Sequence, residues 1–276
     1  MRPEDRDRTV QALLQKSRYD FQDLLDIMAI LRLPGGCMWD AEQTHKSIRD
    51  AMIEETYEVI EAIDNEDPVL LREELGDALF QIVFHARIEE EAERFEIGDV
   101  INDVSAKMIH RHPHVFGSVT VNSTENVLEN WEKIKTEEKK RETLVSRLEA
   151  VPPQLPALMR ASKIIKKTEF FFGEADRDAA LDAAQRSLDA IRSASEKEAQ
   201  ALIGAFLYDA VALSRKLSVS AEEALTKTVN RKIALVGVAE SLANGTPLED
   251  LSREERELLR KRLDEIDAET DPSKKE

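Results

Sequence analysis

The sequence predicts an all-α protein, and three observations support this. Glycine and proline, which interrupt helices, occur only nine times each among 276 residues, while the strong helix formers Ala, Leu, Glu, Lys and Arg dominate. Apolar residues recur every three to four positions through most of the chain, which is the period of an amphipathic helix. Because 42% of the residues are hydrophobic, the chain can bury a core, and we expect helical bundles.

The first half contains five expected helices separated by turn residues. They are expected over about 18–32, 44–65, 68–94, 98–112 and from 124 onwards. Asp67 is a suitable N-cap and Pro68 a suitable first-turn residue for the third helix. Pro113 cannot continue the fourth helix, and Ser123 or Thr124 is expected to cap the fifth.

Three prolines, at positions 152, 153 and 156, mark the expected domain boundary. Four more helical segments follow them: "PALMRASKIIKKTEFF", "DAALDAAQRSLDAIRSA", "EAQALIGAFLYDAVALSRKL" and "SAEEALTKTVNRKIALVGVAESL". We therefore expect a first domain over 1–150, with a helical extension over 1–20, a second domain over 151–268 and a disordered polar tail over 269–276.

The second domain reads as a degenerate copy of the first. The segment "LGDALFQIVFHAR" aligns with "IGAFLYDAVALSR", pairing Gly76 with Gly204, Leu79 with Leu207, Val83 with Val211 and Arg87 with Arg215. Two helical bundles could match this well by composition alone, but the same order of helices surrounds both segments, which favours a true repeat. The acids are mostly lost in the second copy: Glu74 aligns with Leu202, Asp77 with Ala205, and Glu55 and Glu58 fall opposite Arg186 and Asp189.

Charge and composition limit the partners. The formal net charge of −17 argues against nucleic acid or an anionic membrane as a partner, because phosphate backbones attract Lys and Arg. A phosphorylated ligand would need an added cation. The single cysteine, Cys37, excludes an internal disulfide. The charged N-terminus lacks a signal-peptide pattern and no apolar stretch reaches membrane-spanning length, so we expect a cytoplasmic protein.

Polar residues interrupt the otherwise apolar segment "EELGDALFQIVFHARI" at 73–88. Glu74, Asp77, Gln81 and His85 fall within about 80° of one another on a helix. Carboxylates in an apolar setting are costly unless they face water, pair with bases or hold a cation. The preceding segment, "MIEETYEVIEAI", offers more acids instead of bases.

Taken alone, that preceding segment fits an ordinary solvated helix face. As the antiparallel neighbour of the next helix, however, it would bring Glu55 and Glu58 opposite Glu74 and Asp77. Four clustered carboxylates repel one another unless a divalent ion lies among them, and hard oxygen ligands suit Mg²⁺, with Mn²⁺ as a possible substitute.

The chain resembles a known family at this point. Glu-Glu-x-x-Glu at 54–58, fifteen intervening residues and Glu-x-x-Asp at 74–77 are similar to the signature of the all-α nucleoside triphosphate pyrophosphohydrolases. Five ordered stretches, "GCMWDAEQTH", "EETYEVIEAI", "EELGDALFQIVFHA", "RHPHVFG" and "LPALMRASKI", resemble MazG proteins. The resemblance is strong from about residue 24 to 140 and weaker beyond.

The resemblance implies a Mg²⁺-dependent hydrolase that cleaves nucleoside triphosphates between the α and β phosphorus atoms, giving a monophosphate and pyrophosphate, in nucleotide-pool house-cleaning. The implied metal ligands are Glu55, Glu58, Glu74 and Asp77. The implied catalytic residues are Glu54, Glu55 and Glu58, with Glu54 as an unligated carboxylate that can accept a proton. Relatives usually form homodimers, so a homodimer is expected.

Five further residues are candidates for substrate binding. Lys107 and Arg111 lie four apart on one helical face, and the family uses such a pair near the phosphates; ordinary surface bases would explain them equally well. Trp131 is a candidate for stacking on a base, with Lys135 at a phosphate, and Trp39 has similar standing. A tryptophan is more often part of a core.

Two other functions compete with this one. A di-iron carboxylate bundle also places acids between helices, but such sites carry Glu-x-x-His pairs, and neither Glu58 nor Glu74 has His three residues later. A non-enzymatic helical interaction module, with the acids as a binding surface, is the second alternative.

Overall fold

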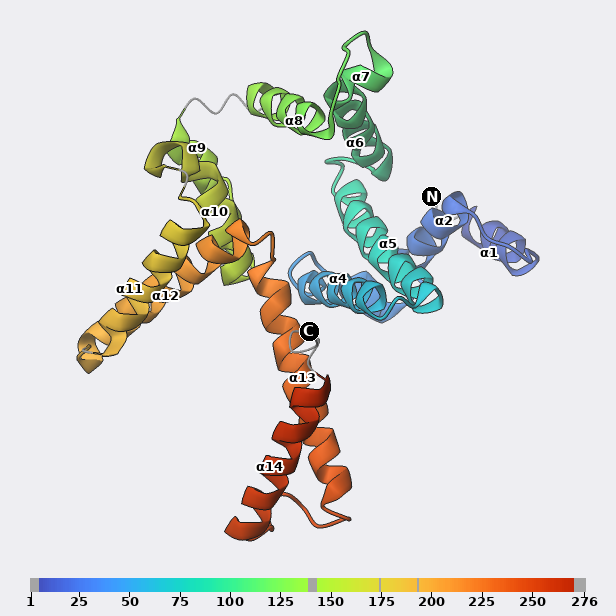
Figure 1. Ribbon diagram of the computed structural model, residues 1–276. Helices are drawn as coiled ribbons and strands as arrows, with labels where there is room; N and C mark the ends of the chain where they lie inside the picture. The colour runs from blue at the N-terminus through green and yellow to red at the C-terminus, as the bar shows by residue number, and fades with distance from the viewer. Residues whose placement is uncertain (1–4, 139–142, 174, 193, 271–276) are drawn as a thin grey trace. The chain divides into compact units, whose positions relative to one another are not determined.

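The computed structural model describes residues 5–138, 143–173, 175–192 and 194–270. The described residues form helices, turns and loops without a strand, which confirms the all-α class (Figure 1). The chain divides into two compact units, Met1–Lys139 and Lys140–Glu276. The three prolines, where the sequence placed a boundary, lie inside the second unit, between α9 (Leu144–Glu149) and α10 (Ala157–Phe172).

The first unit contains eight helices within the part of the chain that is described. They are α1 (Arg6–Leu14), α2 (Phe21–Arg32), α3 (Met38–Glu42), α4 (Arg49–Asp64), α5 (Pro68–Glu91), α6 (Ile97–Arg111), α7 (Pro113–Phe116) and α8 (Thr124–Glu138). Helices α4 and α5 pack on each other along their length, α2 packs on α5, and α6 packs on α8.

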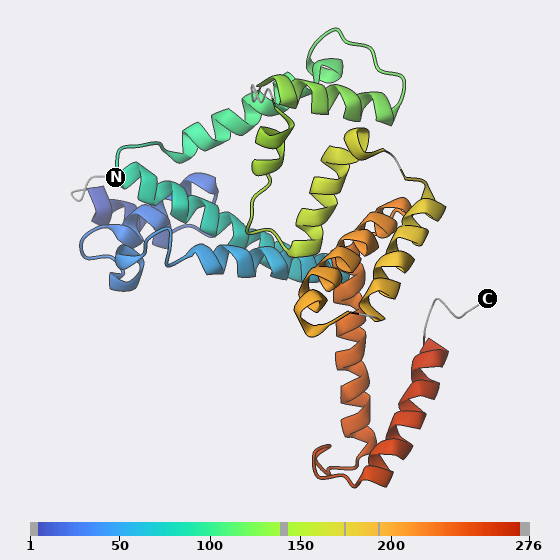
Figure 2. The same cartoon turned by 90° about the vertical axis from the view of Figure 1, so that its left-hand side faces the viewer.

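The α4–α5 hairpin follows from its turn. Glu66 has a left-handed φ of 52°, and the side chain of Asp67 accepts hydrogen bonds from the backbone N–H groups of Val69 (2.9 Å) and Leu70 (3.1 Å). Pro68 occupies the first turn of α5, where its missing N–H has no helical partner to lose. This short connection makes α4 and α5 antiparallel neighbours, as Figure 2 shows.

The core of the first unit lies where α2 meets α5. Met28, Ile48, Val83 and Phe84 are buried there, with Phe80 and Ile88 among the partly buried side chains packed against them. Arg32, at the end of α2, donates to Glu91 of α5, and its guanidinium lies 5.2 Å from the centre of the Phe84 ring.

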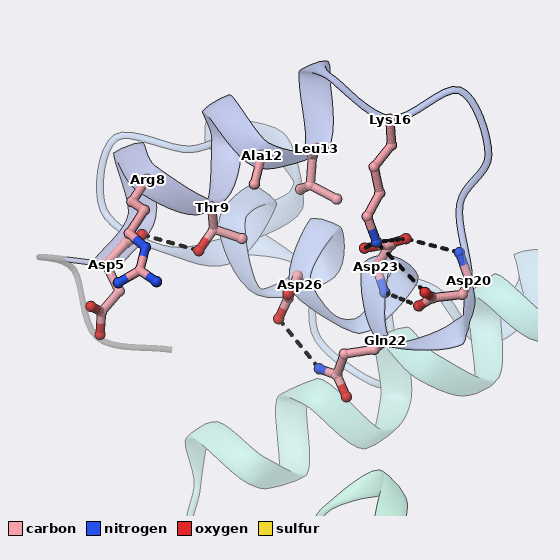
Figure 3. Close-up of a pocket in the computed structure, with 10 residues that line it drawn as sticks. All are labelled: Asp5, Arg8, Thr9, Ala12, Leu13, Lys16, Asp20, Gln22, Asp23 and Asp26. Atoms are coloured by element: carbon pink, nitrogen blue, oxygen red, sulfur yellow. Dashed lines mark hydrogen bonds and ion pairs between the residues drawn. The ribbon is translucent and has the colours of Figure 1, made fainter.

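Helix α1 is held to α2 by charged side chains that satisfy one another. Lys16 Nζ lies 2.5 and 2.7 Å from the carboxylate oxygens of Asp23, and Asp20 and Asp23 form a capping box at the start of α2 (Figure 3). The hydrogen bond from Lys16 is the main cause that lowers the pKa of Asp23. The cavity between α1 and α2, about 490 Å³, is therefore lined in part by Lys16, Asp20 and Asp23, which already pair with one another.

The second unit contains α9, α10, α11 (Arg177–Arg192), α12 (Glu196–Lys216), α13 (Ala221–Leu242) and α14 (Arg253–Thr270). Helices α11 and α12 form a hairpin, α10 packs on α12, and α13 packs on α14. The arrangement of α10, α11 and α12 thus repeats that of α2, α4 and α5. The aligned residues Val83 and Val211 are 2% and 1% exposed, which supports the predicted repeat.

Several helix boundaries differ from the predicted ones. Helix α2 begins at Phe21, three residues later than expected, and α4 begins at Arg49 instead of about 44. Helices α3, α7, α9 and α14 were not predicted. Helix α14 extends to Thr270, so the tail expected over 269–276 begins inside it, and its remainder, 271–276, falls outside the described residues. None of the helices described is long and apolar enough to cross a membrane.

Candidate functional site

Three of the predicted acids converge on the α4–α5 hairpin. Glu55 and Glu58 lie one turn apart on α4, and Glu74 lies on α5. Each offers a carboxylate oxygen, and these three oxygens lie within 4.8 Å of one another. All three residues are partly buried. The two helices therefore place the acids on their facing sides, as the sequence predicted.

The electrostatics of this cluster favour a bound cation. Burial raises the pKa of Glu55, and the charges of Asp77 and Glu58 raise it further. Burial also raises the pKa of Glu74, assisted by the charges of Glu58 and Asp77. Both shifts mean that the ionised carboxylates are held in an environment that disfavours their charge, and a cation among them would remove that penalty.

The donor set fits a hard divalent ion. It consists only of carboxylate oxygens, which suit Mg²⁺ and Mn²⁺ better than softer metals. Within the described residues, Glu55, Glu58 and Glu74 are the one group of three or more His, Cys, Asp or Glu side chains whose ligand atoms converge. The histidines near Pro113 do not join such a group; His112 instead contacts the carbonyl oxygen of Met108 at 2.6 Å.

The other two predicted acids border this cluster. Asp77 lies one turn after Glu74 on α5 and is exposed. It is not part of the three-residue group, but its charge acts on both Glu55 and Glu74. Glu54 is exposed on α4, next to Glu55 in the chain. It is not part of the three-residue group either.

Arg111 and Trp131 form a second group on α6 and α8. The Arg111 guanidinium donates to Glu138, with Nη2 and Oε2 2.5 Å apart, and lies 5.3 Å from the centre of the Trp131 ring. The hydrogen bond from Arg111 is the main cause that lowers the pKa of Glu138. His112 also contacts this group, with its ring centre 4.9 Å from that of Trp131.

The remaining candidates are less organised. Lys107 is exposed on α6, one turn before Arg111. Lys135 of α8 lies 3.1 Å from the carboxylate of Glu132. Trp39, in the short helix α3, is 63% exposed.

The acids and the cationic residues form two separate groups. Figure 1 shows α6 and α8 beyond the C-terminal end of α5, whereas Glu74 and Asp77 lie in the first half of that helix. Among the described residues, neither an ion pair nor a hydrogen bond connects the four acids to Lys107, Arg111 or Lys135. The sequence identified both groups but did not show that they lie apart.

The sequence missed a histidine network at the C-terminal end of α5. His85 Nδ1 lies 2.7 Å from Nδ1 of His45, in the segment before α4. His45 also contacts Glu89, which receives a hydrogen bond from Arg94 at 2.7 Å. The predicted polar stripe therefore divides: Glu74 belongs to the acid cluster and Asp77 borders it, whereas His85 belongs to the histidine network. The four-residue spacing from His85 to Glu89, which places both on one face of a helix, is the sequence feature that could have indicated this network.

Between these two parts lies Gln81. It is 8% exposed, and its Oε1 atom is buried without a hydrogen-bond partner among the described residues. A buried amide oxygen normally has a hydrogen-bond partner. Gln81 lies on α5 one turn beyond Asp77, so a buried polar group without a partner among the described residues follows directly after the acids on this helix.

Comparisons with known proteins agree with this geometry. The model of the MazG nucleotide pyrophosphohydrolase domain matches residues 43–116, which include α4 to α7 and the acid cluster. A Thermotoga maritima protein named nucleoside triphosphate pyrophosphohydrolase/pyrophosphatase MazG is 38% identical over 84% of this chain and 90% of its own length.

Two further relatives carry related names. The nucleoside triphosphate pyrophosphohydrolase of Escherichia coli K12 is 42% identical over 74% of this chain and 81% of its own length. The protein of that name from Mycobacterium tuberculosis is 39% identical over 53% of this chain and 44% of its own length. Similarity to the first two relatives extends over most of the chain.

Proposed function

Because this chain belongs to the MazG family of nucleotide pyrophosphohydrolases, we propose that it hydrolyses nucleoside triphosphates to a nucleoside monophosphate and pyrophosphate. Cleavage at the α–β phosphoanhydride bond and a role in clearing unwanted nucleotides are the finer parts of this proposal. The observation that carries it is the convergence of Glu55, Glu58 and Glu74 on the α4–α5 hairpin.

The acids have distinct proposed roles. Glu55, Glu58, Glu74 and Asp77 would hold the metal, for which Mg²⁺ is the proposed ion and Mn²⁺ a substitute. Such an ion supplies charge neutralisation for the triphosphate and activation of a water molecule. Glu54 lies beside the cluster with its carboxylate exposed, so it is the proposed acceptor of the proton that this water loses.

The cationic group is proposed to bind the substrate. Arg111 presents a planar guanidinium that can bind phosphate oxygens with two parallel hydrogen bonds, and Lys107 adds a second positive charge on the same helical face. Trp131 is the proposed platform for the base, with Lys135 at a phosphate and Trp39 as a further candidate. Arg111 would have to exchange Glu138 for the substrate phosphate, since it is paired in this structure.

A homodimer is proposed as the working form. Ile53 and Tyr57 on α4 are 50% and 53% exposed, and Ile60, Leu75 and Leu79 add to the exposed apolar surface of the same hairpin. Several exposed apolar side chains on one hairpin favour an interface there. Sedimentation analysis should give twice the chain mass, and Ile53→Lys should shift it towards the monomer; a wild-type monomer would contradict this part.

The decisive experiment compares wild type with Asp77→Ala on a panel of ribonucleoside and deoxyribonucleoside triphosphates with Mg²⁺. We expect pyrophosphate and monophosphate from the wild type and almost none from the variant, with unchanged helical circular dichroism. Release of inorganic phosphate instead of pyrophosphate would contradict the cleavage position. An inactive wild type would favour a non-enzymatic interaction module.

A further inference from the structure

The second unit contains a cavity at the place where the first unit has its core. It measures about 310 Å³ and lies between α10, α11 and α12. Among the residues that line it are Ile165, Thr168, Glu169, Tyr208, Ala212 and Lys216. This volume is at the lower end of the range for small-molecule pockets.

The repeat explains how this cavity arises. In the alignment of α5 with α12, Tyr208 corresponds to Phe80 and Ala212 to Phe84; one residue further, Lys216 corresponds to Ile88. All three residues of the first unit belong to its apolar core or pack against it. The second copy has therefore exchanged a large buried ring for a methyl group and an aliphatic side chain for a cation.

The surrounding scaffold is retained. Val211 is 1% exposed, like its counterpart Val83 at 2%, and α10 still packs on α12. Removing a phenyl ring from a packed core normally costs several kcal/mol because it leaves an unfilled space. A fold that keeps its hairpin while opening this space has room for a ligand in place of a side chain.

A cation lines the cavity beside a carboxylate that it shares with a second cation. Glu169 accepts from two cations: Lys216 Nζ lies 3.2 Å from one carboxylate oxygen and Arg215 Nη2 lies 3.4 Å from the other. Arg215 Nε is buried and has no hydrogen-bond partner among the described residues. Of these three charged residues, Glu169 and Lys216 line the cavity, and the two cations share a single carboxylate.

The other lining residues are mainly apolar. Ile165 is 8% exposed and Ala180 is 3% exposed. The buried Thr168 hydroxyl already donates to the carbonyl oxygen of Ile164 at 3.0 Å, so it presents its methyl group as much as its oxygen. The Tyr208 hydroxyl is the additional polar group that the first unit lacks at Phe80.

We propose that this cavity binds a small molecule that combines one aromatic ring system with one anionic group, such as an aromatic carboxylate. The ring would occupy the space left by the Phe84-to-Ala212 exchange, between Ile165 and Ala180. The anionic group would lie at Lys216, where it competes with Glu169 for the positive charge. The site is separate from the acid cluster, which belongs to the first unit.

The test uses three probes of nearly equal shape on the full-length protein: 2-naphthoate, neutral 2-acetylnaphthalene and cationic 2-naphthylmethylamine. Equilibrium dialysis measures each dissociation constant. We expect 2-naphthoate to bind at least tenfold more tightly than either of the others. Equal binding of all three probes, or tighter binding of the cation, would overturn the proposed ligand class.

Two variants locate the binding at the cavity. Ala212→Phe restores the side chain of the first unit and should weaken 2-naphthoate binding by at least tenfold. Lys216→Gln removes the charge but keeps a polar side chain, one atom shorter, and should weaken binding of the anion while leaving that of 2-acetylnaphthalene within twofold. The matched control is Ala201→Phe, at an exposed position of the same helix, which should bind like wild type.

Each alternative gives a different result. If Ala212→Phe loses helical circular dichroism, Lys216→Gln alone decides the assignment. Wild-type binding by both variants would place the probe elsewhere and overturn the proposal. Probe affinity that falls as protein concentration rises would show that a second copy of the chain covers the cavity, which also overturns it.

Discussion

The α4–α5 and α11–α12 hairpins share a scaffold and differ in what lies between their helices. Both hairpins pack against a preceding helix and bury the aligned residues Val83 and Val211. Between α4 and α5 lie the converging acids; at the aligned positions the second hairpin has Leu202 and Ala205. The acids are therefore unnecessary for the fold.

The apolar cores beside the two hairpins also differ. The first unit fills the space beside α5 with Phe84, whereas the second leaves a cavity beside Ala212. One hairpin thus combines a repulsive acid cluster with a packed core, and the other lacks these acids and borders an open pocket. The first hairpin therefore tolerates clustered charge and the second tolerates an unfilled space, at different places on the same scaffold.

The largest expected effect comes from removing one acid in the first hairpin. Glu58→Gln keeps the size of the side chain but removes a charge that the proposed metal needs, so we expect kcat/KM to fall by about 10³-fold or more. Steady-state pyrophosphate release measures it. The matched control is Asp189→Asn, at the aligned position of α11, which should stay within twofold of wild type. An equal loss in both variants would show that the second hairpin also takes part in catalysis.

The next effect tests the packed core. Phe84 is 1% exposed, and we expect Phe84→Ala to lower the free energy of unfolding of the first unit by about 3–5 kcal/mol. Both tryptophans, Trp39 and Trp131, lie in the first unit, so urea unfolding followed by tryptophan fluorescence reports on that unit.

Val211→Ala is the control for this experiment. It removes a buried side chain from the second unit and should change the unfolding measured by circular dichroism but not that measured by tryptophan fluorescence. A Phe84→Ala variant with an unchanged fluorescence midpoint would contradict the assignment of the core.

Much of this comparison could be predicted from sequence because it depends on local patterns. The Asp67-Pro68 pair predicted the start of α5 and its neighbour relation with α4, and this relation brought the acids together. The features that the sequence did not predict have other causes. Helix α14 was missed because it is strongly charged and has few apolar residues to set a period, although Ser252 and Glu255 hydrogen-bond each other's backbone N–H groups at its start.

Features that depend on tertiary contacts could not be predicted from local sequence patterns. Helix α4 begins late because Thr44 and Ser47 exchange side-chain hydrogen bonds with each other's backbone N–H groups, an alternative to helix that short polar side chains offer. The contact between His45 and His85 joins residues forty positions apart, and the separation of Arg111 from the acids depends on the direction of α6. Neither follows from periodicity.

A smaller effect tests the cost of the acids. Without metal, Glu74→Gln should raise the melting temperature of the first unit by a few degrees, because it removes one of three carboxylates whose oxygens lie within 4.8 Å and whose repulsion contributes to the raised pKa of Glu74. Mg²⁺ should stabilise the wild type and have little effect on the variant. Glu61→Gln, at an exposed position of α4, is the control. A metal-free Glu74→Gln protein that melts below wild type would show that the cluster is stabilising by itself.

The smallest effect concerns the far end of the first hairpin, where Glu89 aligns with Leu217 of the second copy. The hydrogen bond from Arg94 is the main cause that lowers the pKa of Glu89 from 4.5 to about 2, and His45 contributes. A folded-state pKa below that of the unfolded chain gives stability that is fully present above about pH 4.5 and is lost as the pH falls towards 2.

Glu89→Gln should therefore melt slightly below wild type at pH 7, and the two melting curves, followed by tryptophan fluorescence, should approach each other between about pH 4.5 and 2. Glu90→Gln, which removes an exposed neighbouring acid with an ion pair to Arg87, is the matched control and should melt close to wild type at pH 7. If the difference in melting temperature between Glu89→Gln and wild type persisted unchanged at low pH, the stabilisation would come from packing instead of from the charge of Glu89. The exchange of Glu89 for Leu217 between the two hairpins would then have no electrostatic consequence.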